Sequence, residues 1–136
     1  MANGTIAFDT LSTSGQITGT AKSVDTDFVV NGSAKSWVNI NGAADPIALR
    51  EGFNAAGLTD HAESDYTHTI TNLMSNATFM AHVTGDLGTV GDFAVACTND
   101  VNRVRTTSTI SMRIGNTAGA SKDTTVAAIS IHGDLA

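Results

Sequence analysis

The stretch DYTHTITN, residues 65–72, alternates between large side chains and threonines. Tyr66, His68 and Ile70 lie on one face of an extended chain, and three threonines lie on the other. A period of two is typical of a β-strand, and two unlike faces are typical of an antiparallel sheet that packs on one side. The stretch therefore predicts a half-buried strand.

The same period continues through most of the chain. In AKSWVNIN, residues 34–41, Ser36, Val38 and Ile40 alternate with Trp37 and two asparagines. Turn signals rich in Gly, Asn and Asp separate the periodic runs, as in sandwiches and barrels built from short strands. The predicted strands are residues 34–41, 47–54, 65–72, 77–84, 93–98, 101–107, 109–114 and 125–133.

The chain is predicted to consist of a head and an arm. Residues 34–136 are expected to form an all-β head, an antiparallel β-sandwich or jelly-roll-like domain, in which residues 53–63 have the least regular pattern and could hold a short helical turn. Residues 1–33 have few large apolar side chains, too few to offset the entropy lost on ordering. They are interpreted as an extended N-terminal arm that orders against another subunit or protein. The alternative is a pair of edge strands on the same domain.

The composition favours β structure and excludes several functions. Only 15% of the residues are charged and 20 are Thr, a balance that favours strands over helices. The net charge is −6, and seven Lys and Arg residues do not supply the basic footprint of a nucleic-acid binder. No apolar run approaches the roughly 18 residues of a membrane span. We expect no nucleic-acid partner and no membrane insertion.

The cysteine content and the first residues bear on the compartment. Cys97 is the only cysteine, and it lies in the apolar run FAVACT, residues 93–98, which predicts a buried, unreactive thiol. One cysteine also fits assembly in a reducing cytoplasm. The first residues, MANGTI, lack the basic and apolar regions of a signal peptide, so no secretion leader is expected.

The predicted head contains five sequence blocks in order. They are AKSWVNING at residues 34–42, IALREGFN at 47–54, DYTHTI at 65–70, MRI at 112–114 and TVAAISI at 125–131. Together they resemble a β-rich module of the tail-fibre and related virion proteins of tailed phages. Leu49, between Ile47 and Arg50, departs from that pattern. The resemblance implies a non-catalytic module that works as a homotrimer on a virion assembled in the host cytoplasm.

Three functions compete. The first is a tail-fibre or tail-tip protein that binds a host receptor. The second is a capsid decoration, head-fibre or spike protein that is attached to the shell through the N-terminal arm. The third is a carbohydrate-binding module, or a small hydrolase, of non-viral origin. The partners implied by the first two are further copies of the chain, another virion protein held through the arm, and a host surface glycan or protein.

Two groups of residues are candidates for binding. Asp60, His61, Glu63 and Asp65 are interpreted as one polar receptor-contact loop, because loops carry binding on sandwich scaffolds. The second candidate is Trp37, which shares a strand face with two asparagines, a mix that saccharide sites use, and which is therefore a candidate stacking aromatic. The alternative for Trp37 is packing at a subunit or sheet interface.

Catalytic and metal sites have weaker support. Asp60, Glu63, His61 and His68 offer oxygen and nitrogen ligands, but no two histidines have the i, i+2 or i, i+4 spacing of a metal site on one element. Ser64 near a His and an Asp suggests hydrolysis, but the Gly-x-Ser-x-Gly elbow is missing. We predict no metal, no cofactor and no enzymatic activity.

Overall fold

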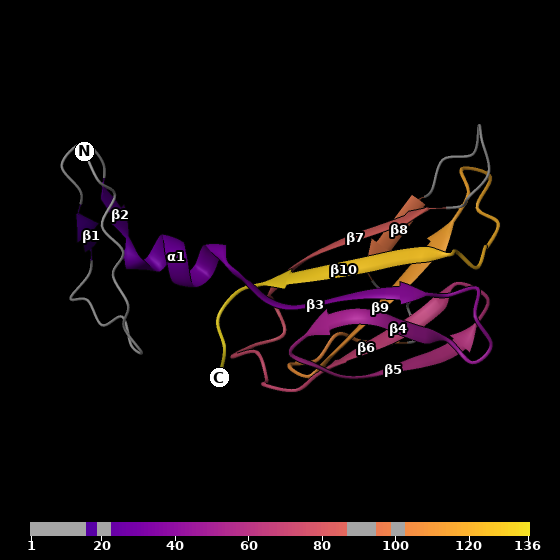
Figure 1. Cartoon of the computed structure of the whole chain (residues 1–136), viewed down its shortest axis with the longest axis horizontal. Helices are drawn as coiled ribbons and strands as arrows, with labels where there is room; N and C mark the ends of the chain where they lie inside the picture. Colours follow the sequence, from indigo (N-terminus) through magenta and orange to yellow (C-terminus); the bar gives the residue numbers. More distant parts are fainter. Residues whose placement is uncertain (1–15, 19–22, 87–94, 99–102) are drawn as a thin grey trace, which may run out of the picture.

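The computed structural model describes residues 16–18, 23–86, 95–98 and 103–136, which are mostly β-strand. Two four-stranded antiparallel sheets pack face to face (Figure 1). The first sheet has the order β4 (Ala48–Phe53), β3 (Ala34–Asn41), β10 (Val126–His132) and β7 (Met80–Asp86). The second has the order β5 (Ala55–Ala62), β6 (Asp65–Ile70), β9 (Thr109–Gly115) and β8 (Val95–Thr98). The predicted all-β sandwich is confirmed.

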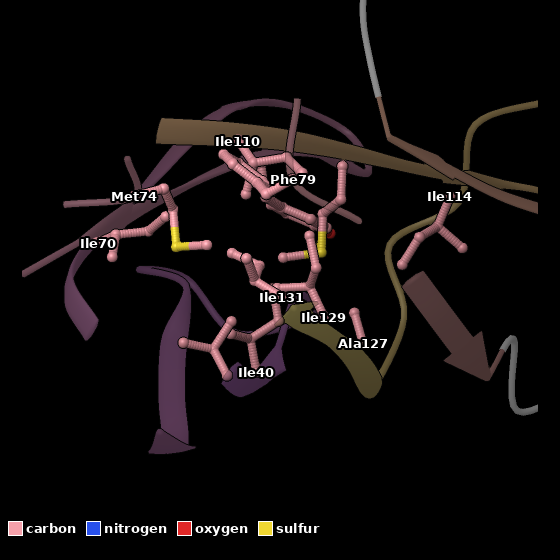
Figure 2. Close-up of a cluster of buried hydrophobic side chains, with 12 residues drawn as sticks. Ile40, Ile70, Met74, Phe79, Ile110, Ile114, Ala127, Ile129 and Ile131 are labelled. Carbon is pink, nitrogen blue, oxygen red and sulfur yellow. The ribbon is translucent and has the colours of Figure 1, made fainter. Parts of the chain in front are cut away.

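The period of two assigns side chains to the core as predicted. Along β3, Ser36, Val38 and Ile40 are buried, while Trp37 and Asn39 lie on the outer face and are half-buried. Figure 2 shows the apolar cluster between the sheets, to which β10 contributes alternate residues. Burying one such side chain stabilises the fold by about 1.5–3 kcal/mol. The cluster consists of Val38, Ile40, Tyr66, Ile70, Met74, Phe79, Ile110, Met112, Ile114, Ala127, Ile129 and Ile131.

Asn54 carries the chain from one sheet to the other. It joins β4 to β5 with a φ of 54°, a left-handed conformation that Asn tolerates better than most residues. Its Nδ2 donates to Lys35 O (2.9 Å) and to Asn72 O (3.1 Å), and its Oδ1 accepts from Asn72 N–H (2.6 Å). These bonds fix the corner between the sheets.

Two local expectations were wrong. The stretch expected to hold a short helical turn, residues 53–63, is the corner followed by strand β5. Residues 103–107, the described part of the strand expected at 101–107, form no strand. There, Thr106 Oγ1 accepts hydrogen bonds from Ser108 N–H (3.2 Å) and Thr109 N–H (3.0 Å), and such local side-chain bonds compete with pairing in a sheet.

The N-terminal elements pair with each other. Strands β1 (Gln16–Thr18) and β2 (Ser23–Asp25) form a two-stranded antiparallel sheet, and helix α1 (Thr26–Gly32) follows. Figure 1 shows these elements beyond the end of the sandwich where β3 begins and β10 ends. His132 Nδ1 lies 3.2 Å from Gly32 O at that junction. Attachment of this segment to another protein, and the homotrimer, stay predictions.

Candidate functional site: a groove on an outer sheet face

Three neighbouring strands of the first sheet present a regular grid of side chains on its outer face. Register places Ser130 of β10 between Trp37 of β3 and His82 of β7. Two residues along, Ala128 lies between Asn39 and Thr84 in the same way. Directly opposed residues of adjacent strands point to the same face, so these residues form two parallel rows.

The grid forms a groove because its middle column is small. Ala128 and Ser130 form the floor along β10, while Trp37 and Asn39 on one side and His82 and Thr84 on the other form the walls. The walls stand on strands two spacings apart, roughly 9–10 Å. The open volume is about 500 Å³, within the range of small-molecule sites.

Two neighbours extend or orient the walls. Phe53 of edge strand β4 lies directly opposite Trp37 and is 55% exposed, so the aromatic surface continues beyond the groove. On the other wall, the rings of His82 and His132 meet edge-on, with centroids 6.0 Å apart and planes at 89°. This contact restricts the orientation of the His82 ring toward the groove.

The groove contains an unsatisfied polar atom. Asn39 Oδ1 is buried and has no hydrogen-bond partner within the described part of the chain. Leaving a buried acceptor unpaired costs about 1–3 kcal/mol. Rotation of the Asn39 side chain would present Oδ1 to a ligand hydroxyl or amide in the groove, and the hydrogen bond formed there would recover that free energy beside the Trp37 ring.

The predicted receptor-contact loop is a β-hairpin, which corrects the loop assignment. Asp60 and His61 belong to β5, Glu63 lies in the turn, and Asp65 begins β6. The first three are exposed, whereas Asp65 is buried and forms an ion pair with Arg103. A carboxylate held in this way is not presented to a partner. Receptor contact by the exposed three stays a prediction.

Ser64, the nucleophile considered in the sequence, is a structural turn residue. It is buried with a φ of 57°, and its Oγ accepts from Lys122 N–H (3.0 Å). Its own N–H donates to Asp123 Oδ1 (2.7 Å), which also accepts from Tyr66 OH (2.8 Å). Burial, reinforced by Asp123, raises the pKa of Tyr66 well above its usual value of 10. These contacts hold the connection between β9 and β10 against the β5–β6 hairpin.

His68 belongs to the interior between the two sheets. It is fully buried, and its Nε2 lies 2.7 Å from Ser36 Oγ of the opposite sheet. Burial lowers the pKa of His68 from 6.5 to about 4, and a backbone hydrogen bond at Gly57 acts weakly in the other direction. His68 is therefore a neutral core residue at physiological pH, which places it outside any surface metal site with His61.

Neither a metal centre nor a membrane-spanning helix occurs in the described residues. Residues 16–18, 23–86, 95–98 and 103–136 contain no group of three or more His, Cys, Asp or Glu side chains arranged to hold a metal ion. No helix in those ranges is both long and apolar enough to cross a membrane. The predicted burial of the Cys97 thiol concerns a side chain outside the described set.

Comparisons with known proteins add no relative. No protein-family model matches the chain, and neither a curated protein nor a solved structure matches it. The phage-module resemblance therefore depends on the sequence blocks themselves.

Strand alternation placed Trp37 and Asn39 on one strand face and made Trp37 a candidate stacking residue, but it did not point to His82, Thr84 or Ser130. The missing signal is the neighbour order β3–β10–β7, which joins residues separated by tens of positions in the chain.

Proposed function

We propose that this protein is a non-enzymatic structural protein of a tailed-phage virion, of the tail-fibre or tail-tip type, and that it binds a host-surface glycan through the outer-face groove. The observation that carries the binding role is the row Trp37–Ser130–His82, an aromatic wall, a small floor and a polar wall. The virion assignment is supported by the resemblance of residues 34–136 to the phage module.

A binding role fits the groove better than a catalytic one. Glycoside hydrolysis needs two carboxyl groups that flank the scissile bond. The residues that line the groove include none, and the nearest carboxylate by register, Glu51, lies opposite Asn39 on the neighbouring edge strand. Retention of a glycan by stacking and hydrogen bonds requires only the groups that are present.

The second candidate is a capsid decoration, head-fibre or spike protein attached through the N-terminal segment. The observation that favours it is the exposed apolar surface of α1, where Phe28 is 74% exposed, Val29 45% and Val30 48%. A seven-residue helix with three β-branched residues gains little stability by itself, so it needs a packing partner. A capsid protein is one such partner, and a copy of the chain is another. A free carbohydrate-binding module would have the groove but would not need an N-terminal segment for attachment to another protein.

An array of bacterial surface polysaccharides, spotted beside empty phage capsids, tests the proposal. Labelled protein is expected to bind one or more polysaccharides, and Trp37→Ala is expected to lose that binding. Thr59→Ala is the matched control and should bind normally, because Thr59 is an exposed residue opposite Thr67 on the other sheet. Both variants are first checked by circular dichroism. Binding to capsids alone supports the second candidate, and polysaccharide binding that Trp37→Ala leaves intact contradicts the groove.

A further inference from the structure

We propose that the groove selects a neutral pyranose, with one sugar ring stacked on Trp37 and its hydroxyl rim directed at Asn39 and at the β10 and β7 side chains. This inference rests on the proposed function and narrows it to a class of ligand. Its three supports are the charge around the groove, the chemistry of its walls and the small side chains of its floor.

Charge excludes acidic sugars. The side chains that line the groove carry no carboxylate, Lys or Arg. By register, the residues that flank it on the same face include Glu51, opposite Asn39, and Asp86, opposite Val126. The whole chain has a net charge of −6. A uronic or sialic acid would therefore enter a region of negative potential, which is unfavourable. Lys35, two residues before Trp37 on β3, already donates to Val30 O and Ser33 Oγ.

The walls match the two sides of a sugar ring. A pyranose has an apolar face of C–H groups and a polar rim of hydroxyls. Trp37 offers a flat apolar ring, and Asn39 beside it offers an amide whose buried Oδ1 is unpaired. Ser130 and Thr84 add hydroxyls that can donate or accept. Stacking fixes the plane of the sugar, and the amide then discriminates between hydroxyl configurations.

The floor argues against a second copy of the chain as the occupant. Interfaces between copies have an apolar, aromatic-rich centre and a polar rim. Here the centre is Ala128 and Ser130, and the large exposed apolar residues of the sheet, Leu49, Phe53 and Met80, lie on the edge strands. The small side chains at the centre leave room for a small ligand and supply no large apolar group for a protein interface.

Trp37 is the only tryptophan, so its fluorescence reports directly on the groove. The probes are the methyl glycosides of glucose, galactose and mannose, N-acetylglucosamine, glucuronic acid and sialic acid. At least one neutral sugar is expected to change the intensity or wavelength of emission with saturation. Glucuronic and sialic acid are expected to bind at least tenfold more weakly. Equal or tighter binding of an acidic sugar would overturn the inference.

Calorimetric titration of the best neutral sugar separates the residue roles, because it does not depend on the tryptophan signal. Asn39→Ala is expected to weaken binding at least tenfold, and Thr59→Ala is expected to leave it unchanged. Sedimentation is run on Trp37→Ala: a change in oligomeric state would assign the face to a second copy and overturn the inference. If no neutral sugar binds but Trp37→Ala still abolishes polysaccharide capture on the array, the ligand class is wrong and the proposed function survives. If no neutral sugar binds and Trp37→Ala also leaves polysaccharide capture unaffected, both the ligand class and the proposed binding function are wrong.

Discussion

The two outer faces of the sandwich differ in how their polar side chains are satisfied. On the β5–β6–β9–β8 face, the side chains bond to one another: His61 Nε2 lies 2.9 Å from Thr67 Oγ1, which lies 2.9 Å from Ser111 Oγ. On the β4–β3–β10–β7 face, an aromatic ring stands beside an amide whose Oδ1 has no partner in the described chain. On the first face the polar side chains already have hydrogen-bond partners, so they need no ligand. On the second face the Trp37 ring and the Asn39 amide are left to contact one.

The largest expected effect is the difference in stability loss between a core-facing residue and a groove-facing residue of β10. Ile129→Ala deletes a core side chain that is 2% exposed, and we expect it to lower the free energy of unfolding by about 2–5 kcal/mol. Ser130→Ala, one residue along on the groove floor, should change it by less than about 0.5 kcal/mol. Urea unfolding measures both. Equal losses for the two variants would show that the groove floor is not a surface.

The next effect depends on pH and concerns His68, which contacts Ser36 of the opposite sheet in the core. The folded pKa of His68 is about 4 and the unfolded value is 6.5, so the unfolded chain takes up the proton first as pH falls. The stability contributed by neutral His68 is therefore complete above about pH 6.5 and is lost as pH falls toward 4, by about 3 kcal/mol in total.

His68→Gln keeps a side chain that can bond to Ser36 but removes the titration. Urea unfolding of both proteins at intervals from pH 7 to 4 tests the assignment, because acidic residues contribute equally to both curves. We expect the variant to show a flatter dependence over this window. Parallel curves for the two proteins would mean that His68 is not the group that titrates.

The smallest effect compares one threonine on each outer face. Thr67→Val removes the hydroxyl that joins His61 to the buried Ser111, and we expect a loss of about 1–3 kcal/mol in unfolding free energy. Thr84→Val, in the groove, breaks no bond within the described residues and should cost less than about 0.5 kcal/mol. Thermal unfolding of both suffices. If Thr84→Val lowers the unfolding free energy as much as Thr67→Val, the polar side chains of the groove face are already hydrogen-bonded within the protein, which contradicts the comparison.

The sequence predicted the strand faces well because burial and the period of two are local signals. Ser36, Val38 and Ile40 were assigned to one face and are buried together. The stretch 53–63 was not recognised because Asn54 turns the chain between sheets and the register of β5 shifts twice against β6. Each shift adds a residue to one strand and breaks the alternation that identifies a strand.

The candidate site was only partly predictable for a different reason. Trp37 was identified from its own strand, but the groove exists because β10 places Ser130 beside it and β7 places His82 beyond. That order is set by packing of the whole sandwich rather than by any strand's pattern. The polar segment 60–65 gave a stronger local signal, and folding turned it into a hairpin with Asp65 buried.

Amide chemical-shift mapping with the tightest-binding neutral sugar of the panel tests the central claim most directly. Titration of ¹⁵N-labelled protein is expected to move the resonances of Trp37, Asn39 and Ser130, together with the Trp37 indole N–H, and to leave those of Asp60, His61 and Glu63 in place. Shifts confined to the hairpin residues, with the β3 and β10 resonances unchanged, would contradict the account and return the binding role to the hairpin.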